Sequence, residues 1–325
     1  DPEFTSAFNS AELMPLFADA REYGKLFVVT IKADFSHLAS KFLFPALYSA
    51  AIWFLILLSF TRGQKRTILL AGLAFVFGIF SAGLTLYLVM LQERIQGFDY
   101  ESQVTPLGRA IYFIAGVGLR EELAKLICFI PLAILLRKQN NNLAALVIAG
   151  VVGLGFAAQE NILYYQNTLG QVTYTPWTRL LTANAIHIAM TGVIGFYFYR
   201  MLVRKGRGWE DFLLNFILMV VAHGMYDAVL TLPSLSQYGP ISVIIIALIV
   251  YRYLDPLKAN IDTTRLHRRL SPLGIFVLGS VLLVCGTLVF SAVGAPFRFA
   301  FGAFAMAVGG MVPTAFVFVS RFRDI

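Results

Sequence analysis

The stretch GLREELAKL occupies residues 118–126, in the middle of an apolar run from about residue 107 to about residue 136. Charged side chains at the centre of a bilayer span are costly when unpaired, so they usually mark a pathway or a site. On a helix, Lys125 lies one turn beyond both Glu121 and Glu122 and can neutralise one of these carboxylates, with help from Arg120. The other carboxylate is then free for a functional role. The alternative is a structural ion pair that ties two spans together.

The composition of the whole chain agrees with a membrane protein. Its 325 residues are 58% hydrophobic and only 14% charged. Long continuous apolar runs are typical of spanning helices, whereas barrel strands are short and alternate. We therefore expect an all-α, polytopic transmembrane helical bundle with about nine spans. These spans are expected at about residues 42–60, 68–91, 107–136, 143–165, 180–199, 212–232, 241–254, 273–293 and 297–319.

The N-terminal part differs from the rest of the chain. Residues 1–4, Asp-Pro-Glu-Phe, have the composition of a cloning scar, and residues 5–41 mix charges with short apolar pieces. This mixture predicts one or two amphipathic helices lying on the membrane surface. Residues 42–325 are expected to form a single membrane domain, with a turn at residues 294–296 between its last two spans. Cys128 and Cys285 fall inside expected spans and read as packing residues.

The net charge of +8 comes from basic residues in alternate loops, near residues 62–66, 137–138, 200–207, 258–269 and 321–323. This pattern indicates a lipid bilayer as the partner and argues against nucleic acid. The remaining loops are acidic, weakly charged or uncharged. By the positive-inside rule the basic loops are cytoplasmic, so nine spans put the N-terminus outside and the C-terminus in the cytoplasm.

Ionisable residues recur in the spans that follow the opening stretch. The span at 143–165 holds Glu160 and Asn161, and on the next span Asn184, His187 and Thr191 share one helical face. Both Glu160 and His187 also have a purely structural explanation. Glu160 can lie close enough to the interface to be hydrated, with Asn161 hydrogen-bonded to it. His187 can be a core histidine satisfied by Asn184 or Thr191.

His223 and Asp227 are one turn apart on the span at 212–232. Asp227 can orient the imidazole of His223, or the two can form a structural pair. Glu160 lies about five residues from the outer end of its span, His187 about seven, His223 about nine and Glu122 about fourteen, at about 1.5 Å per residue. Glutamates and histidines at a similar depth are the set that a hydrolytic site needs. We expect a shared site within residues 107–232, in the outer half of the membrane.

Four motifs on successive spans carry a family resemblance. They are EELAK at 121–125, FAAQEN at 156–161, His187, and HGMYD at 223–227. In order and spacing they resemble the PrsW-type intramembrane proteases, within the larger CPBP/Abi superfamily of CAAX-processing and bacteriocin-related membrane peptidases. The resemblance implies a multi-pass protein of the bacterial inner membrane. It also implies an endopeptidase that cleaves membrane-anchored, single-span proteins near the extracytoplasmic side, such as an anti-sigma factor.

The chain departs from the CAAX branch at one position, where Glu160 stands in place of a histidine. A second carboxylate favours a divalent metal such as zinc, because two histidines and a carboxylate suit a catalytic zinc site. The candidate ligands are His187, His223, Glu160 and Glu121. A purely glutamate-based mechanism without metal stays an alternative.

The resemblance also suggests roles for the individual residues. Glu121, or otherwise Glu122, would activate the attacking water, while His187 and His223 would bind metal or stabilise the oxyanion. Glu160 would be a ligand or a second acid/base. The supporting residues would be Lys125 on the other glutamate, Asn161 on Glu160, and Asp227 on His223, together with Asn184 and Arg120. Two other classes stay open: a proton- or cation-coupled transporter, and a non-catalytic membrane scaffold.

Overall fold

The computed structural model describes residues 10–40, 42–61, 65–167, 175–261, 271–293 and 296–324. Within these ranges every regular element is helical and there is no strand, which confirms the expected all-α fold. Some expectations fall on residues outside these ranges. They concern residues 1–9, the loop charges Arg62, Arg265, Arg268 and Arg269, and the turn at residues 294–295.

Two short helices come first in the described chain: α2 (Ser10–Asp19) and α3 (Tyr23–Ser36), the latter followed by the 3₁₀ turn η1 (His37–Ala39). They fall in the segment expected to lie on the membrane surface, and neither is among the helices long and apolar enough to cross a membrane. The membrane helices that follow are α4 (Leu43–Phe60), α5 (Lys65–Met90) with the π-helix η2 (Leu91–Ile95), α8 (Asn142–Asn167), α9 (Thr175–Val203), α10 (Trp209–Thr231), α11 (Pro240–Ala259), α12 (Pro272–Val293) and α13 (Phe297–Phe322). The 3₁₀ helix η4 (Pro233–Tyr238) joins α10 to α11.

Eight helices in the described ranges are long and apolar enough to span a membrane, and all eight correspond to expected spans. The ninth, at residues 107–136, is not one apolar helix. It consists of α6 (Pro106–Ile111), the π-helix η3 (Tyr112–Gly118) and α7 (Leu119–Arg137). The segment is not counted among the apolar spanning helices because of its charge. Its helix α7 carries both glutamates of the opening stretch together with Arg120, Lys125 and Arg137.

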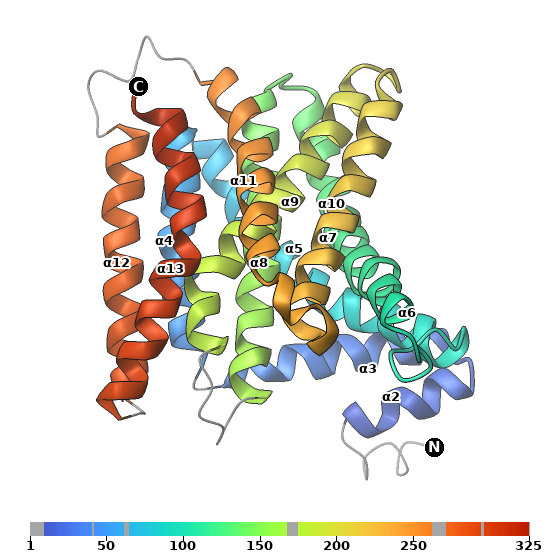
Figure 1. Cartoon of the computed structure of the whole chain (residues 1–325). Coiled ribbons are helices and arrows are strands. Elements are labelled where there is room, and N and C mark those ends of the chain that lie inside the picture. Colours follow the sequence, from blue (N-terminus) through green and yellow to red (C-terminus); the bar gives the residue numbers. More distant parts are fainter. Residues whose placement is uncertain are drawn as a thin grey trace.

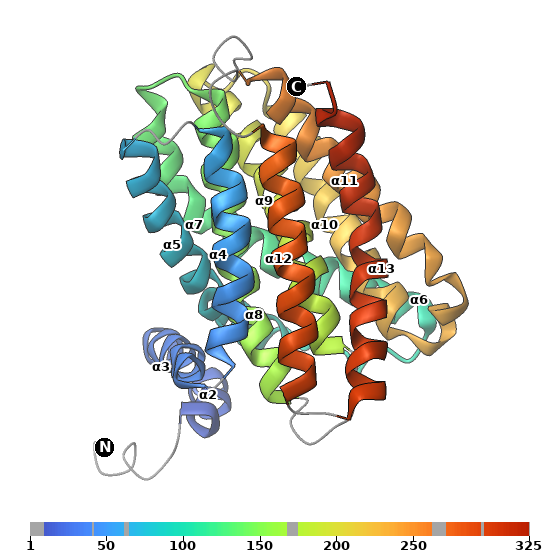
Figure 2. The same ribbon diagram turned by 90° about the vertical axis from the view of Figure 1, so that its left-hand side faces the viewer.

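The bundle is centred on α8 and α9, which are buried along almost their whole lengths, whereas α12 is exposed over most of its surface. In Figure 2, α4, α12 and α13 stand side by side, with α5 at the edge of the view. The helices α2 and α3 lie across one end of the bundle, and α3 packs on α5 (Figure 1). The most enclosed helices are therefore the two that carry Glu160 and His187.

Glycines let the central helices approach backbone to backbone. A Cβ on Gly153 of α8 would lie 2.1 Å from the carbonyl oxygen of His187 on α9. Likewise, a Cβ on Gly224 of α10 would lie 2.4 Å from Cα of Ile114 in η3, and one on Gly118 would lie 2.6 Å from the carbonyl oxygen of Val220. Small residues at helix interfaces are common in membrane bundles. Here they bring α7, α8, α9 and α10 close enough for their polar side chains to meet.

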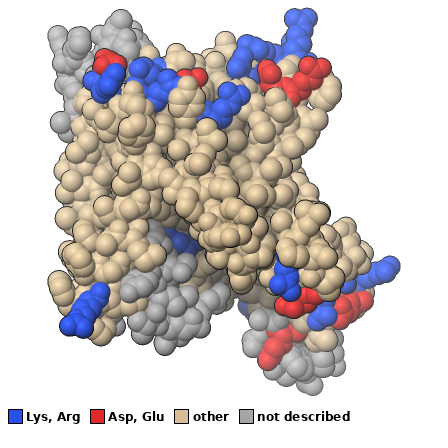
Figure 3. All heavy atoms as spheres, in the orientation of Figure 1, with Lys and Arg blue, Asp and Glu red and all other residues tan. Residues whose placement is uncertain are grey.

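Charged side chains are unevenly distributed over the surface. On the face drawn in Figure 3 they gather at the two ends, and the broad middle band is almost free of them. A basic patch away from the ends lies inside a recess in the lower half of this face. An uncharged band of this kind is what a bilayer core requires of a protein that spans it.

Candidate active site

The two adjacent glutamates of α7 have different surroundings, because neighbouring residues on a helix point about 100° apart. Glu122 is fully buried, whereas Glu121 retains a small exposed fraction. Glu122 Oε1 lies 2.7 Å from Lys125 Nζ and 2.9 Å from His223 Nδ1. Glu121 Oε2 lies 3.5 Å from Lys125 Nζ and 3.5 Å from His223 Nε2. Glu122 is thus the closely paired carboxylate and Glu121 the more loosely held one.

Lys125 connects α7 to α9. Besides the two glutamates, its Nζ lies 3.0 Å from Nδ1 of His187, and it sits over the ring of Phe156 at 4.1 Å from the ring centroid. An ammonium group has three N–H donors and no acceptor, so the three neighbours can each accept one. His187 Nδ1 is then the unprotonated ring nitrogen.

The other side of His187 faces α8. Its Nε2 lies 2.9 Å from Oε2 of Glu160, which can accept the Nε2 proton. Asn184 and Thr191, the partners expected for His187, are placed otherwise. Asn184 donates to Ser49 Oγ at 2.6 Å, and Thr191 Oγ1 is buried without a hydrogen-bond partner in the described structure. Lys125 and Glu160 therefore engage both ring nitrogens of His187 and fix its tautomer. A metal ion bound to His187 would take Nδ1 and displace the hydrogen bond from Lys125.

His223 is held from both sides. Its Nδ1 faces Glu122, and its Nε2 lies 3.4 Å from Asp227 Oδ2, close to the distance that separates it from Glu121. Asp227 was expected to orient this ring. Glu122 makes the closer contact, and Asp227 lies on the same side of the ring as Glu121. A proton on Nδ1 leaves the lone pair of Nε2 directed at this side.

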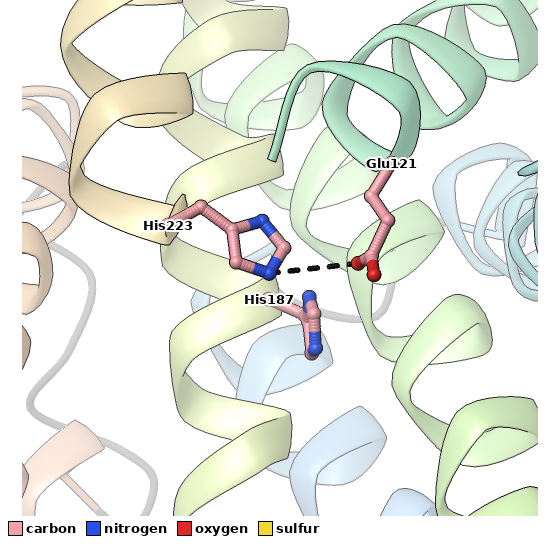
Figure 4. A group of neighbouring side chains, drawn as sticks. All are labelled: Glu121, His187 and His223. Carbon is pink, nitrogen blue, oxygen red and sulfur yellow. Dashed lines mark ion pairs between the residues drawn. The ribbon is translucent and has the colours of Figure 1, made fainter. Parts of the chain in front are cut away.

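Three of the four candidate metal ligands converge. The side chains of Glu121, His187 and His223, from α7, α9 and α10, point toward one another, and each offers a ligand atom within 4.8 Å of the others (Figure 4). Glu160 is not in this group; it contacts Nε2 of His187 from α8. Two imidazoles and one carboxylate match a catalytic zinc site, and Glu122 supplies the outer carboxylate that orients a ligating histidine.

The charges of the group also suit a divalent cation. Ion pairs and the two histidines link four carboxylates and two cations, namely Glu121, Glu122, Glu160 and Asp227 with Lys125 and Arg179. With neutral histidines they leave a formal charge of −2. Buried charge is tolerated when it is compensated, and one divalent ion supplies that compensation. The residues therefore fit a divalent metal.

Arg179 is a site residue that the sequence analysis did not single out. It lies at the start of α9 and forms an ion pair with Glu160, and its Nε lies 3.2 Å from Asn161 Oδ1. A signal for it exists in the sequence, because Arg179 and Glu160 lie near facing ends of two consecutive spans. Antiparallel neighbours joined by a loop bring such positions to the same level.

Two further supporting residues occupy places other than those expected. Asn161 donates to Asn184 Oδ1 at 3.3 Å and accepts from Arg179, so it reaches Glu160 only through Arg179. Arg120 was expected to help neutralise the glutamates. Its guanidinium pairs with Glu93 at 2.9 Å and donates to Tyr112 Oη at 3.0 Å instead. The reason is geometric, because a residue adjacent to Glu121 on a helix points to a different side.

Comparison with known proteins agrees with this geometry. A model of the PrsW family of intramembrane metalloproteases matches residues 65–253, more than half of the chain and all of the polar helices described above. No curated protein and no solved structure matches the chain.

Proposed function

Because the chain belongs to the PrsW family of intramembrane metalloproteases, we propose that this multi-pass membrane protease hydrolyses peptide bonds at the group formed by Glu121, His187 and His223. The observation that carries the proposal is the convergence of these three side chains within 4.8 Å from three different helices. We propose that residues 107–232 are the catalytic core of a single membrane domain at 42–325.

In this proposal Glu121, His187 and His223 hold a divalent metal, which supplies Lewis-acid activation of water and of the scissile carbonyl. Glu121 would take the proton of the attacking water and pass it to the amine that leaves when the peptide bond breaks. Glu122 is poorly suited to that task, since its Oε1 is already engaged by Lys125 and His223. Glu122 instead keeps the proton of His223 on Nδ1, and Lys125 offsets its charge.

The substrate we propose is a membrane-anchored, single-span protein cleaved near the extracytoplasmic side of a bacterial inner membrane, with an anti-sigma factor as one candidate. Glu160 lies about two helical turns from the end of α8. The basic loops lie at the opposite ends of the spans, so the positive-inside rule supports an outward-facing site, with the N-terminus outside and the C-terminus in the cytoplasm. The order of the four motifs supports placement in the CPBP/Abi superfamily.

The test is cleavage of a single-span substrate by the purified protein in proteoliposomes. We expect Glu121→Gln to lower kcat by about 10³-fold or more, as the loss of a catalytic carboxylate does. The control Glu101→Gln, an exposed glutamate outside the site, should cleave as the wild type does. Chelation with 1,10-phenanthroline should abolish cleavage and added zinc should restore it.

Two results would contradict this proposal. Retained cleavage in Glu121→Gln would remove that residue from the mechanism, and cleavage insensitive to chelators would remove the metal. Ion flux through proteoliposomes, with no cleavage of any single-span substrate, would favour the transporter alternative.

A further inference from the structure

Arg179 is held in one position by three contacts. Its guanidinium pairs with Glu160, its Nε donates to Asn161 Oδ1 at 3.2 Å, and the group lies over the ring of Tyr164 at 3.7 Å from the centroid. The side chain is 15% exposed, so the pair with Glu160 is largely removed from solvent. An arginine held in this way presents a fixed fork of donors.

A chain of buried amides anchors Arg179 to the scaffold. Asn161 donates to Asn184, Asn184 donates to Ser49 on α4 at 2.6 Å, and Ser49 donates to the carbonyl oxygen of Leu180 at 2.6 Å. All three polar side chains are almost completely buried. Satisfied buried networks rigidify their surroundings. The guanidinium is therefore located by three helices, α4, α8 and α9.

A single oxygen atom, Oε2 of Glu160, links Arg179 to the proposed active site. Oε2 of Glu160 receives both the guanidinium of Arg179 and Nε2 of His187, the latter at 2.9 Å. The ring of His187 is held on its other edge by Lys125 Nζ, 3.0 Å from Nδ1. Without the guanidinium, the charge of Glu160 would be poorly compensated. Its carboxylate would then be free to move toward the group formed by Glu121, His187 and His223. Arg179 thus decides where the carboxylate beside His187 lies.

We propose that Arg179 is a positioning residue, which holds Glu160 in place and through it fixes the ring orientation of His187 for metal binding and cleavage. The inference rests on the proposed function, because it assigns His187 to the metal group. It assigns Glu160 to orienting His187, in place of the ligand or acid/base roles suggested by the sequence. Outer partners of metal-ligating histidines typically contribute 10- to 100-fold to affinity or activity.

The first test measures metal binding without any substrate. We expect Arg179→Met to weaken Zn²⁺ binding, measured by competition with a fluorescent chelator, by about 10- to 100-fold. The absorption spectrum of bound Co²⁺ should change as well. Arg179→Lys retains the charge and should recover part of the affinity. An unchanged Zn²⁺ affinity and an unchanged Co²⁺ spectrum in Arg179→Met would overturn the proposal.

The second test is a double-mutant cycle with Glu160→Gln. If Arg179 acts only through Glu160, the double variant Arg179→Met with Glu160→Gln should bind Zn²⁺ no more weakly than Glu160→Gln alone. Losses that multiply would show that Arg179 acts independently of Glu160, and the proposal would fail. The double variant also removes both partners of the buried ion pair, so it avoids leaving one charge uncompensated if Arg179→Met alone fails to fold.

Cleavage kinetics then separate positioning from substrate binding. Arg179→Met should lower kcat by about 10- to 100-fold with KM changed by less than about twofold. A raised KM with an unchanged kcat would identify Arg179 as a substrate-binding residue and refute the proposal. The matched control is Arg321→Met on α13, outside the proposed core, whose guanidinium also pairs with a carboxylate, that of Asp255 at 3.0 Å, and lies over a tyrosine ring, that of Tyr251, at 3.9 Å. It should leave both constants unchanged.

The two readouts distinguish the possible failures. If the wild type binds Zn²⁺ but cleaves no substrate, the proposed function fails, while the metal-binding arm still tests Arg179. If the wild type cleaves its substrate and Arg179→Met matches it in both assays, only the role of Arg179 is refuted.

Discussion

In the part of the chain that the structure describes, buried carboxylates occur in two regions, and their surroundings differ. In the active-site group, Glu122 is paired with Lys125 and His223, and Glu160 with Arg179 and His187. Where α3 meets α8, Asp34 is only 2% exposed, and its Oδ2 is buried without a partner in the described structure. Gln159 donates to the backbone carbonyl oxygen of Asp34 at 2.8 Å.

The difference shows two ways in which a buried acid is tolerated. In the active-site group, nearby cations compensate the charge. At α3, which lies outside the eight spanning helices, a proton can remove it. Burial raises the pKa of Asp34 from 3.8 to about 6, and the Gln159 side chain offsets only part of this rise. The first region is suited to charged groups and the second to a neutral acid, and three substitutions test this contrast.

The largest effect should come from Lys125→Met, which removes the main counter-charge of Glu122. Breaking a buried ion pair by deleting one partner costs about 3–5 kcal/mol. We expect a free energy of unfolding lower by that amount, measured by denaturant titration in detergent. Adding Glu122→Gln should recover most of the loss, because no uncompensated carboxylate then remains. Equal stability of Lys125→Met and wild type would show that Glu122 is not held as a buried anion.

Asp34→Asn should raise the free energy of unfolding, whereas Lys125→Met should lower it. Because folding raises the pKa of Asp34, the folded protein binds this proton more tightly than the unfolded chain does. Stability therefore falls as the pH rises from 3.8 to about 6, and the loss is complete above that range. A difference of about two pKa units corresponds to about 3 kcal/mol.

Thermal unfolding of the two proteins across pH checks this expectation. The gain in stability from Asp34→Asn at pH 8 should exceed the gain at pH 4 by about 2.5 kcal/mol, because a small part of the loss has already occurred at pH 4. An equal gain at both pH values would show that Asp34 is already ionised in the folded protein at low pH.

The smallest effect should come from Arg120→Met. Arg120 pairs with Glu93, whose side chain is 26% exposed, and not with the glutamates of the active-site group. We expect a stability loss of about 1 kcal/mol, as for a partly exposed ion pair, and nearly unchanged kcat/KM. A fall in kcat/KM as large as that of Glu121→Gln would place Arg120 in the site after all.

Much of the architecture could be predicted from the sequence. Apolar runs predict the spanning helices because length and hydropathy decide membrane insertion. The segment at 107–136 does not form one apolar helix, because α7 carries charged residues and the π-helix η3 precedes it. Motif order and depth also predicted that a glutamate of α7 would meet His187 and His223, without deciding between Glu121 and Glu122, and placed Glu160 in the same group.

What could not be predicted depends on contacts between helices. Spacing along one helix cannot show which of Glu121 and Glu122 faces α9 and α10, because that follows from the packing of η3 against α10. Nor can it show that Glu160 pairs with Arg179, or that Ser49, on a span without charged residues, completes the chain of buried amides. Polar partners on separate helices leave no periodic signal in the sequence.

The hydroxyl of Ser49 has a consequence for how this protein can be divided. The family match begins at residue 65, after the end of α4, yet the buried amide of Asn184 donates to a side chain on α4. Trp53, Ile56 and Phe60 of the same helix belong to the hydrophobic core. The stretch that is shared with the family is therefore completed, in this chain, by a helix that lies outside it. A fragment trimmed to the homologous boundaries would leave an amide unsatisfied and an apolar face uncovered, so expression and engineering should keep α4 with the helices it supports.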